Sequence, residues 1–116
     1  MPDPVAVRAS EPETFDHAAV VALDGDGSIV GRATLSRLYG PRAEVRIELA
    51  PTTTITLALI DALEREARKR GLVRLELDAV ALSDSSVAAL RRWRPIADEV
   101  RASHQYLTWS TTPVNS

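Results

Sequence analysis

Cysteine is absent from the 116 residues of this chain. Its absence excludes disulfides, thiolate metal sites and cysteine nucleophiles, and it suits a reducing cytoplasm. No apolar run approaches the ~20 residues that a membrane-spanning helix requires. The opening residues, MPDPVAVRAS, lack the basic and apolar segments of a signal peptide. We therefore expect a cytoplasmic protein that does not enter a membrane.

The sequence also lacks an excess of charge of either sign. The chain has 14 basic and 16 acidic residues, which give a net charge of −2 with no block of either sign. A nucleic-acid-binding domain normally presents a basic face, so nucleic acid is not an expected partner. His17 and His104 have no acidic residue or cysteine at ligand spacing, and no metal site is expected.

What is present is the composition of an ordinary globular protein, with 45% hydrophobic and 26% charged residues. The length suits one domain over residues 1–116, with a core in residues 18–93. Residues 1–16 contain three prolines and are expected to be poorly ordered, apart from a short strand at residues 5–8. A C-terminal strand is expected within residues 100–112.

Three antiparallel strands are predicted before any helix. The apolar run 18–23 is long enough for a buried strand, and the Asp-Gly turn after it leads into a second strand at residues 29–39. Residues 43–49 alternate between Val, Ile and Leu on one face and Glu and Arg on the other, the pattern of a strand with one apolar face.

The spacing of apolar residues then changes to that of a helix, from Ile55 to Ala67. The threonines at 52–54 offer N-cap oxygens, and Gly71 stands where a helix C-cap belongs. Acid and base four residues apart predict three ion pairs on this helix: Asp61–Arg65, Glu64–Arg68 and Glu66–Arg70.

The rest of the chain completes a βαβ unit. Residues 72–80 alternate again, so this strand and strand 43–49 are expected to run parallel. Ser83 or Asp84 is expected to cap a short helix that ends near residue 93, before Pro95. Residues 101–111, rich in Tyr, Trp, Thr and Leu, read as a last strand. The expected fold class is therefore α+β, with a mixed α/β sheet.

Three phrases in this order resemble the Gcn5-related N-acetyltransferase (GNAT) superfamily, over residues 18–93. AAVVALDGDGSIVGRATLSRLYGPRAEVRIELA is similar to the family's second to fourth strands, LALIDALEREARKRGLVRLELDA to the next helix and fifth strand, and LSDSSVAALRRW to the start of the following helix. The "AE-V" phrase is most similar to bacterial protein-lysine acetyltransferases. The resemblance implies a GNAT fold and an acyl-CoA-dependent N-acyltransferase activity.

Two departures from the family pattern affect the expected activity. The family holds the diphosphate of coenzyme A on a glycine-rich loop at a helix N-terminus, where glycine lets the backbone come close. Here residues 51–56, PTTTIT, are shorter and contain no glycine and no basic residue. The family's two helices between its first and second strands are also missing. The acceptor site is therefore open, completed by a partner chain, or lost.

The resemblance implies roles for single residues if the chain is active with acetyl-CoA or another acyl-CoA. Glu44, in the "AE-V" phrase, would be the general base, although it also fits the solvated face of a charged strand. The expected cofactor-binding residues are two on the fourth strand, whose backbone would pair with the pantetheine arm, three at the helix tip, and a serine that replaces a frequent asparagine: Ile47, Leu49, Thr52, Thr53, Thr54 and Ser85.

Two other functions stay open. A non-catalytic GNAT-like scaffold would act through a protein partner or a homodimer, using an exposed sheet edge and the aromatic segment 106–109. RLELDAVALSDSSVAAL is also similar to the "LDLSxVxxxDSSG" segment of STAS domains, which regulate sigma factors. That resemblance implies phosphorylation of Ser85 or Ser86, but the glycine after the serines is missing and little chain remains for the later STAS elements.

Overall fold

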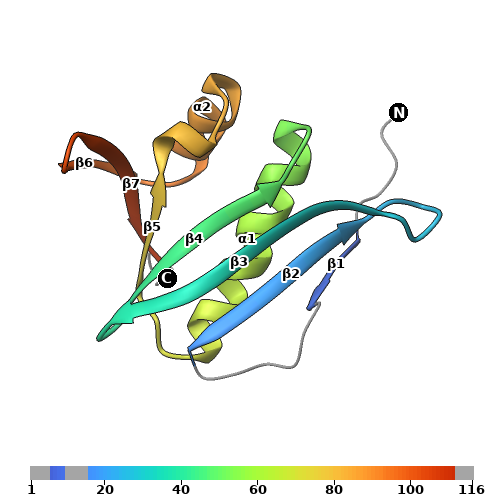
Figure 1. Cartoon of the computed structure of the whole chain (residues 1–116), viewed down its shortest axis with the longest axis horizontal. Coiled ribbons are helices and arrows are strands. Elements are labelled where there is room, and N and C mark those ends of the chain that lie inside the picture. Colours follow the sequence, from blue (N-terminus) through green and yellow to red (C-terminus); the bar gives the residue numbers. More distant parts are fainter. Residues whose placement is uncertain (1–5, 10–15, 112–116) are drawn as a thin grey trace.

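A mixed sheet of seven strands carries two α-helices on one of its faces (Figure 1). The computed structural model describes residues 6–9 and 16–111, with residue 93 described in its backbone alone. The strand order is β1-β2-β3-β4-β5-β7-β6. The elements are β1 (Ala6–Ala9), β2 (His17–Leu23), β3 (Ile29–Tyr39), β4 (Arg42–Leu49), α1 (Thr53–Lys69), β5 (Arg74–Asp78), the 3₁₀ helix η1 (Ala79–Ala81), α2 (Asp84–Trp93), β6 (Ala97–Arg101) and β7 (His104–Ser110).

The predicted fold class is confirmed. β1 to β4 pair antiparallel in sequence order, and β4 and β5, which the crossover helix α1 connects, run parallel.

In the β2–β3 turn, Asp24 Oδ1 accepts hydrogen bonds from the backbone N–H groups of Asp26 and Ser28, and Gly27 has φ +83°. The predicted strand at residues 5–8 is β1, one residue later, and residue 5 lies outside the described residues.

Helix α1 begins and ends where its capping residues predict. Thr52 Oγ1 accepts from the N–H of Ile55 at 3.1 Å, and Gly71 follows the last turn with φ +71°. Its apolar stripe, which includes Leu59 and Leu63, packs on the sheet in one core with Leu90 of α2. Among the described residues, no helix is long and apolar enough to cross a membrane.

The predicted strand 72–80 is shorter than expected. β5 ends at Asp78, because its side chain accepts a hydrogen bond from the N–H of Val80 at 3.1 Å and turns the chain into η1. Helix α2 then begins after Ser83, whose Oγ accepts from the N–H of Ser86 at 3.2 Å. Ser83, rather than Asp84, is therefore the N-cap residue.

The C-terminal segment forms a hairpin where a single strand was predicted. β6 and β7 are joined by Ala102 and Ser103, with φ of 50° and 69°. Such turns favour Gly, Asn or Asp, so the sequence gives no turn signal here. Since β7 lies between β5 and β6, the aromatic segment 106–109 is no sheet edge, and Trp109 is buried.

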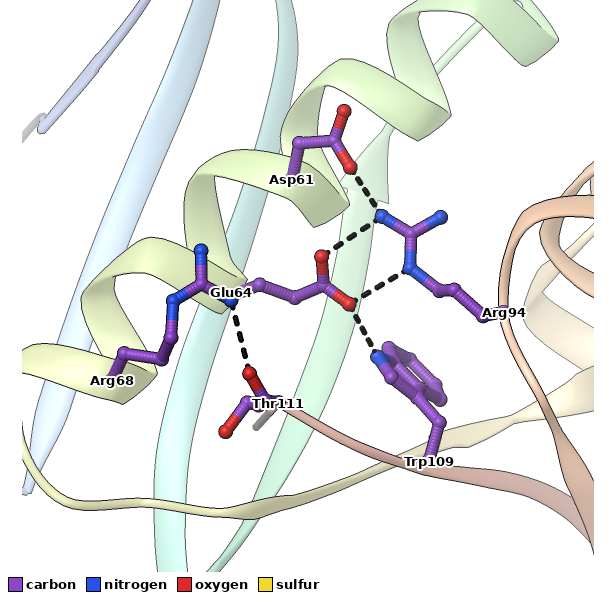
Figure 2. Close-up of polar contacts among 6 residues, drawn as sticks. All are labelled: Asp61, Glu64, Arg68, Arg94, Trp109 and Thr111. Carbon is purple, nitrogen blue, oxygen red and sulfur yellow. Dashed lines mark hydrogen bonds and ion pairs between the residues drawn. The ribbon is translucent and has the colours of Figure 1, made fainter. Parts of the chain in front are cut away.

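Helix α1 is tied to α2 and β7 by a polar cluster (Figure 2). Glu64 accepts from Arg94 Nε and Nη2, both at 2.8 Å, and from Trp109 Nε1 at 2.6 Å. Asp61 also pairs with Arg94, and Arg68 donates to the Thr111 carbonyl oxygen at 3.1 Å. Of the three ion pairs predicted within α1, Glu66–Arg70 is formed, at 2.9 Å, whereas the carboxylates of Asp61 and Glu64 turn to Arg94.

Gly31 of β3 allows α1 to lie close to the sheet, and Gly31→Ala is expected to destabilise the protein. A Cβ atom there would lie 2.6 Å from Ile55 Cγ2, a branched side chain that has little freedom to move. We expect a loss of about 1 to 3 kcal/mol in the free energy of unfolding, measured by urea denaturation. Gly25→Ala is the control, because nothing lies within 4 Å of its Cβ position; equal stability of the two variants would contradict the prediction.

Candidate functional site

The parallel strands β4 and β5 part from each other halfway along β4. They pair from Arg42↔Arg74 to Glu44↔Glu76, yet β4 continues to Leu49. The two arrows diverge toward the N-terminal end of α1 in Figure 1. A cavity of about 310 Å³ lies between them, lined by Val45–Glu48 on one side and by residues of β5 and η1 on the other. We call this space the β4–β5 gap.

A second cavity, of about 290 Å³, adjoins the open end of the gap. The two cavities share Ile47 and Ala81 in their linings. The link from β4 to α1 and the start of α2 form its walls, and they supply six hydroxyl groups: Thr52, Thr53, Thr56, Ser83, Ser85 and Ser86. We call this space the hydroxyl pocket.

The N-termini of both helices meet at the hydroxyl pocket. Their N-cap residues, Thr52 and Ser83, both line it. A hydroxyl chain joins the two tips: Ser83 Oγ donates to Ser86 Oγ at 3.0 Å, and Ser86 Oγ lies 3.3 Å from Thr53 Oγ1. Because a helix N-terminus carries partial positive charge and N–H groups without partners in the helix, two converging tips suit an anionic group.

The predicted cofactor-binding residues are only partly brought together. Ile47, Thr52, Thr53 and Ser85 line the hydroxyl pocket. Thr54, in the first turn of α1, and Leu49, which is 47% exposed, are not among the residues that line it or the gap.

Three of the six hydroxyl residues of the pocket, Thr56, Ser83 and Ser86, were not predicted to bind the cofactor. In the sequence, Ser83 reads as a helix cap and Thr56 as part of the helix, and both readings are right. A signal was present in the sequence, because both helices begin among hydroxyl residues: Thr52 to Thr54 at α1, and Ser83, Ser85 and Ser86 at α2. Their convergence follows from the parallel strands, which place both tips at the same end of the sheet.

Glu44 lies where the two strands begin to part. It is opposite Glu76 of β5 and opposite Ser36 of β3, on the sheet face away from the helices. Its side chain is 29% exposed, and its Oε1 lies 3.6 Å from Arg46 Nε. The carboxylate is thus accessible and only loosely paired, close to the narrow end of the gap.

A buried carboxylate, Glu76, holds the strands together at this narrow end. It accepts from Arg42 of β4 at 3.0 Å and from Arg101 of β6 at 2.6 Å, with its side chain only 4% exposed. The hydrogen bond to Glu76 raises the pKa of Arg101. Each guanidinium also lies over an aromatic ring, of Tyr39 and Tyr106 respectively. Beyond this cluster β4 and β5 separate.

Comparison with solved structures identifies the fold. A Klebsiella pneumoniae protein assigned to the acyl-CoA N-acyltransferases matches with a TM-score of 0.74 at 13% identity, over 93% of this chain and 98% of that one. The PaiA N-acetyltransferase of Thermoplasma acidophilum, in complex with coenzyme A, matches with 0.66 at 18% identity, over 82% of this chain and 61% of that one. An IAA acetyltransferase of Bacillus cereus matches with 0.62 at 16% identity, over 92% and 99%.

No protein-family model and no curated protein matches the sequence. At these identities the solved structures establish the fold and nothing finer. The chain has the fold of the GNAT acetyltransferases, as the order and spacing of its sequence phrases predicted.

Proposed function

We propose that this protein is an acyl-CoA-dependent N-acyltransferase. The observation that carries the proposal is the parting of β4 and β5 after the Glu44–Glu76 pair, with the hydroxyl pocket at the open end of the gap. The gap would take the pantetheine arm along the backbone of β4, at Ile47. The hydroxyl pocket would take the diphosphate.

In this proposal the chain positions the reactants and moves one proton. The thioester of an acyl-CoA supplies an electrophilic carbonyl carbon. Glu44, near the narrow end of the gap, takes a proton from the ammonium group of the acceptor. The amine nitrogen then bonds to the carbonyl carbon, the carbon–sulfur bond breaks, and the sulfur leaves as a thiolate that takes up the second proton released by the nitrogen. The products are an amide and free coenzyme A.

The residues of the pocket fit a diphosphate without glycine. Thr52 Oγ1 and the N–H of Ile55 satisfy each other in the cap, and the N–H of Thr56 bonds to the Thr52 carbonyl oxygen. The N–H groups of Thr53 and Thr54 lie in the first turn, where no earlier helical carbonyl accepts them. The N–H of Thr53 and the hydroxyl of Ser85, both of residues that line the pocket, are the proposed donors.

Coenzyme A binding tests the proposal, and Ser85→Asp is expected to weaken it about tenfold. The new carboxylate would repel the diphosphate, while an acid in the first turn of α2 stabilises that helix, so the fold is kept. Calorimetric titration of both proteins with coenzyme A measures the effect. Ser28→Asp, in the exposed β2–β3 turn, is the control for added charge. Failure of the unmodified protein to bind coenzyme A would refute the proposed function.

A specific observation favours a second candidate, a non-catalytic GNAT-like scaffold that acts through a partner protein or a second copy. The caps at Thr52 and Ser83 already use two hydroxyls of the pocket and the N–H groups of Ile55 and Ser86, so fewer donors are left for a diphosphate. Undetectable binding of coenzyme A would support this function. Nothing in the described structure favours the STAS hypothesis: of its two candidate serines, Ser86 is buried and bonded to Ser83 and Thr53, whereas Ser85 is exposed.

A further inference from the structure

A cavity of about 700 Å³ has no role in the function proposed above. It lies beside β5 on the side away from β4, bordered by η1, α2 and the turn of the β6–β7 hairpin. It shares Asp78 and Val80 with the β4–β5 gap. A molecule held at Asp78 would therefore lie at the boundary of the space proposed for the thioester arm.

The charges of this cavity favour a cation. Its lining includes the carboxylates of Asp78 and Asp84 and one guanidinium, that of Arg91. Arg91 Nη2 is held 2.5 Å from Oδ1 of Asp98, which is not a lining residue. Hydrogen bonds from Arg91 and Gln105 lower the pKa of Asp98, so the charge of Arg91 stays compensated from outside the cavity. Two carboxylates remain on the lining.

The other lining groups favour a ligand with an apolar body. Leu82, between η1 and α2, and Val87 of α2 are only partly buried and contribute hydrocarbon surface. On the rim, His104 Nδ1 lies 3.3 Å from Asp78 Oδ2, and Asp78 Oδ1 accepts from the N–H of Val80. These two contacts fix the carboxylate of Asp78 at the boundary between the cavity and the gap.

We propose that this cavity binds the acyl acceptor, a small amine with an apolar body whose ammonium group is held by Asp78 and Asp84. That the bound amine is acylated rests on the proposed acyltransferase function, whereas the binding of the amine in this cavity does not. A nitrogen held by Asp78 would lie next to Val80, which lines both this cavity and the gap.

Tryptamine and indole-3-propionate are the probes, because they share an aromatic body and differ in the sign of their charge. Each is titrated into the ¹⁵N-labelled full chain, without coenzyme A, and followed by amide NMR shifts. We expect tryptamine to shift the amides of Val87, Ala88 and His104 and to bind at least fivefold more tightly than the acid. Equal binding of the two probes, or shifts confined to other parts of the sheet, would overturn the inference.

Asp84→Asn is expected to weaken tryptamine binding about fivefold, the effect of one ion pair at a partly exposed site. Asp26→Asn makes the same chemical change in the β2–β3 turn and is expected to leave binding unchanged. Similar affinities for the two variants would count against the cavity. A chain that binds tryptamine but not coenzyme A would keep the cation site and lose the proposed function, and the opposite result would remove this inference alone.

Discussion

Replacing Glu64 with alanine is expected to lower the free energy of unfolding by about 3 to 5 kcal/mol. Glu64 joins three elements, because its carboxylate accepts from Arg94 after α2 and from Trp109 of β7 (Figure 2). Arg94 and Glu64 are only 14% and 12% exposed. With alanine at position 64, the Arg94 guanidinium would keep only its weaker partner, Asp61. The buried indole N–H of Trp109 would lose its hydrogen bond to Glu64. Both changes cost free energy in a desolvated site.

Arg94 is charged throughout, so the expected loss of stability in Glu64→Ala does not vary with the protonation of the arginine. The hydrogen bond to Glu64 raises the pKa of Arg94 more than burial lowers it, so Arg94 stays charged at any pH where the protein folds. Asp61→Ala is the matched control on the same helix. Its side chain is 54% exposed, and its pair with Arg94 is expected to contribute less than about 1 kcal/mol.

Urea denaturation followed by far-ultraviolet circular dichroism measures both variants without relying on Trp109 fluorescence, which the change at Glu64 would itself alter. Equal destabilisation by Glu64→Ala and Asp61→Ala would contradict the prediction. A loss of several kcal/mol is a large fraction of the 5 to 15 kcal/mol typical of a domain. Because the cluster lies on the α1–α2 contact, its loss would also disturb the hydroxyl pocket at the other end of these helices.

The local elements were predictable because their signals are local. Thr52, Ser83 and Gly71 act as caps within a few residues of their own positions, and the alternation in β4 follows from its apolar and charged residues. The βαβ order then fixes which strands run parallel. The fold could therefore be predicted from these local signals, together with the resemblance of the three sequence phrases, in their order, to the GNAT superfamily.

Contacts between distant segments were not predictable in the same way. Glu64 lies four residues before Arg68, and helical spacing alone favours that pair. In the structure Glu64 pairs instead with Arg94, thirty positions away, because the packing of α2 on α1 brings the Arg94 guanidinium next to the Glu64 carboxylate. The β6–β7 turn was missed for another reason: Ala102 and Ser103 adopt positive φ without glycine.

The candidate site, too, could be predicted only where its signals are local. Thr52, Thr53 and Ser85 could be named because the family resemblance places cofactor contacts at those positions, and all three line one cavity. The cavity beside β5 could not be predicted, since its walls come from η1, α2 and a turn that the sequence does not signal.

For the proposed reaction, Glu44→Gln is expected to lower kcat about 100-fold or more, the usual contribution of a general base. The amide keeps the shape of the side chain but cannot take a proton from the acceptor ammonium. Coenzyme A affinity should be unchanged, because Glu44 is not among the residues that line the hydroxyl pocket. Steady-state kinetics with acetyl-CoA and tryptamine, at saturating acceptor, measure the effect.

Glu99→Gln is the control for this prediction, because Glu99 also carries a carboxylate on the sheet, in β6, and lines neither the gap nor the hydroxyl pocket. Its carboxylate pairs with Arg101 at 2.7 Å and is 41% exposed. A base at the narrow end of the gap predicts a large effect for the first variant and almost none for the second. Equal losses in the two variants would assign Glu44 to the charged surface of the strand, and another group would then have to take the proton.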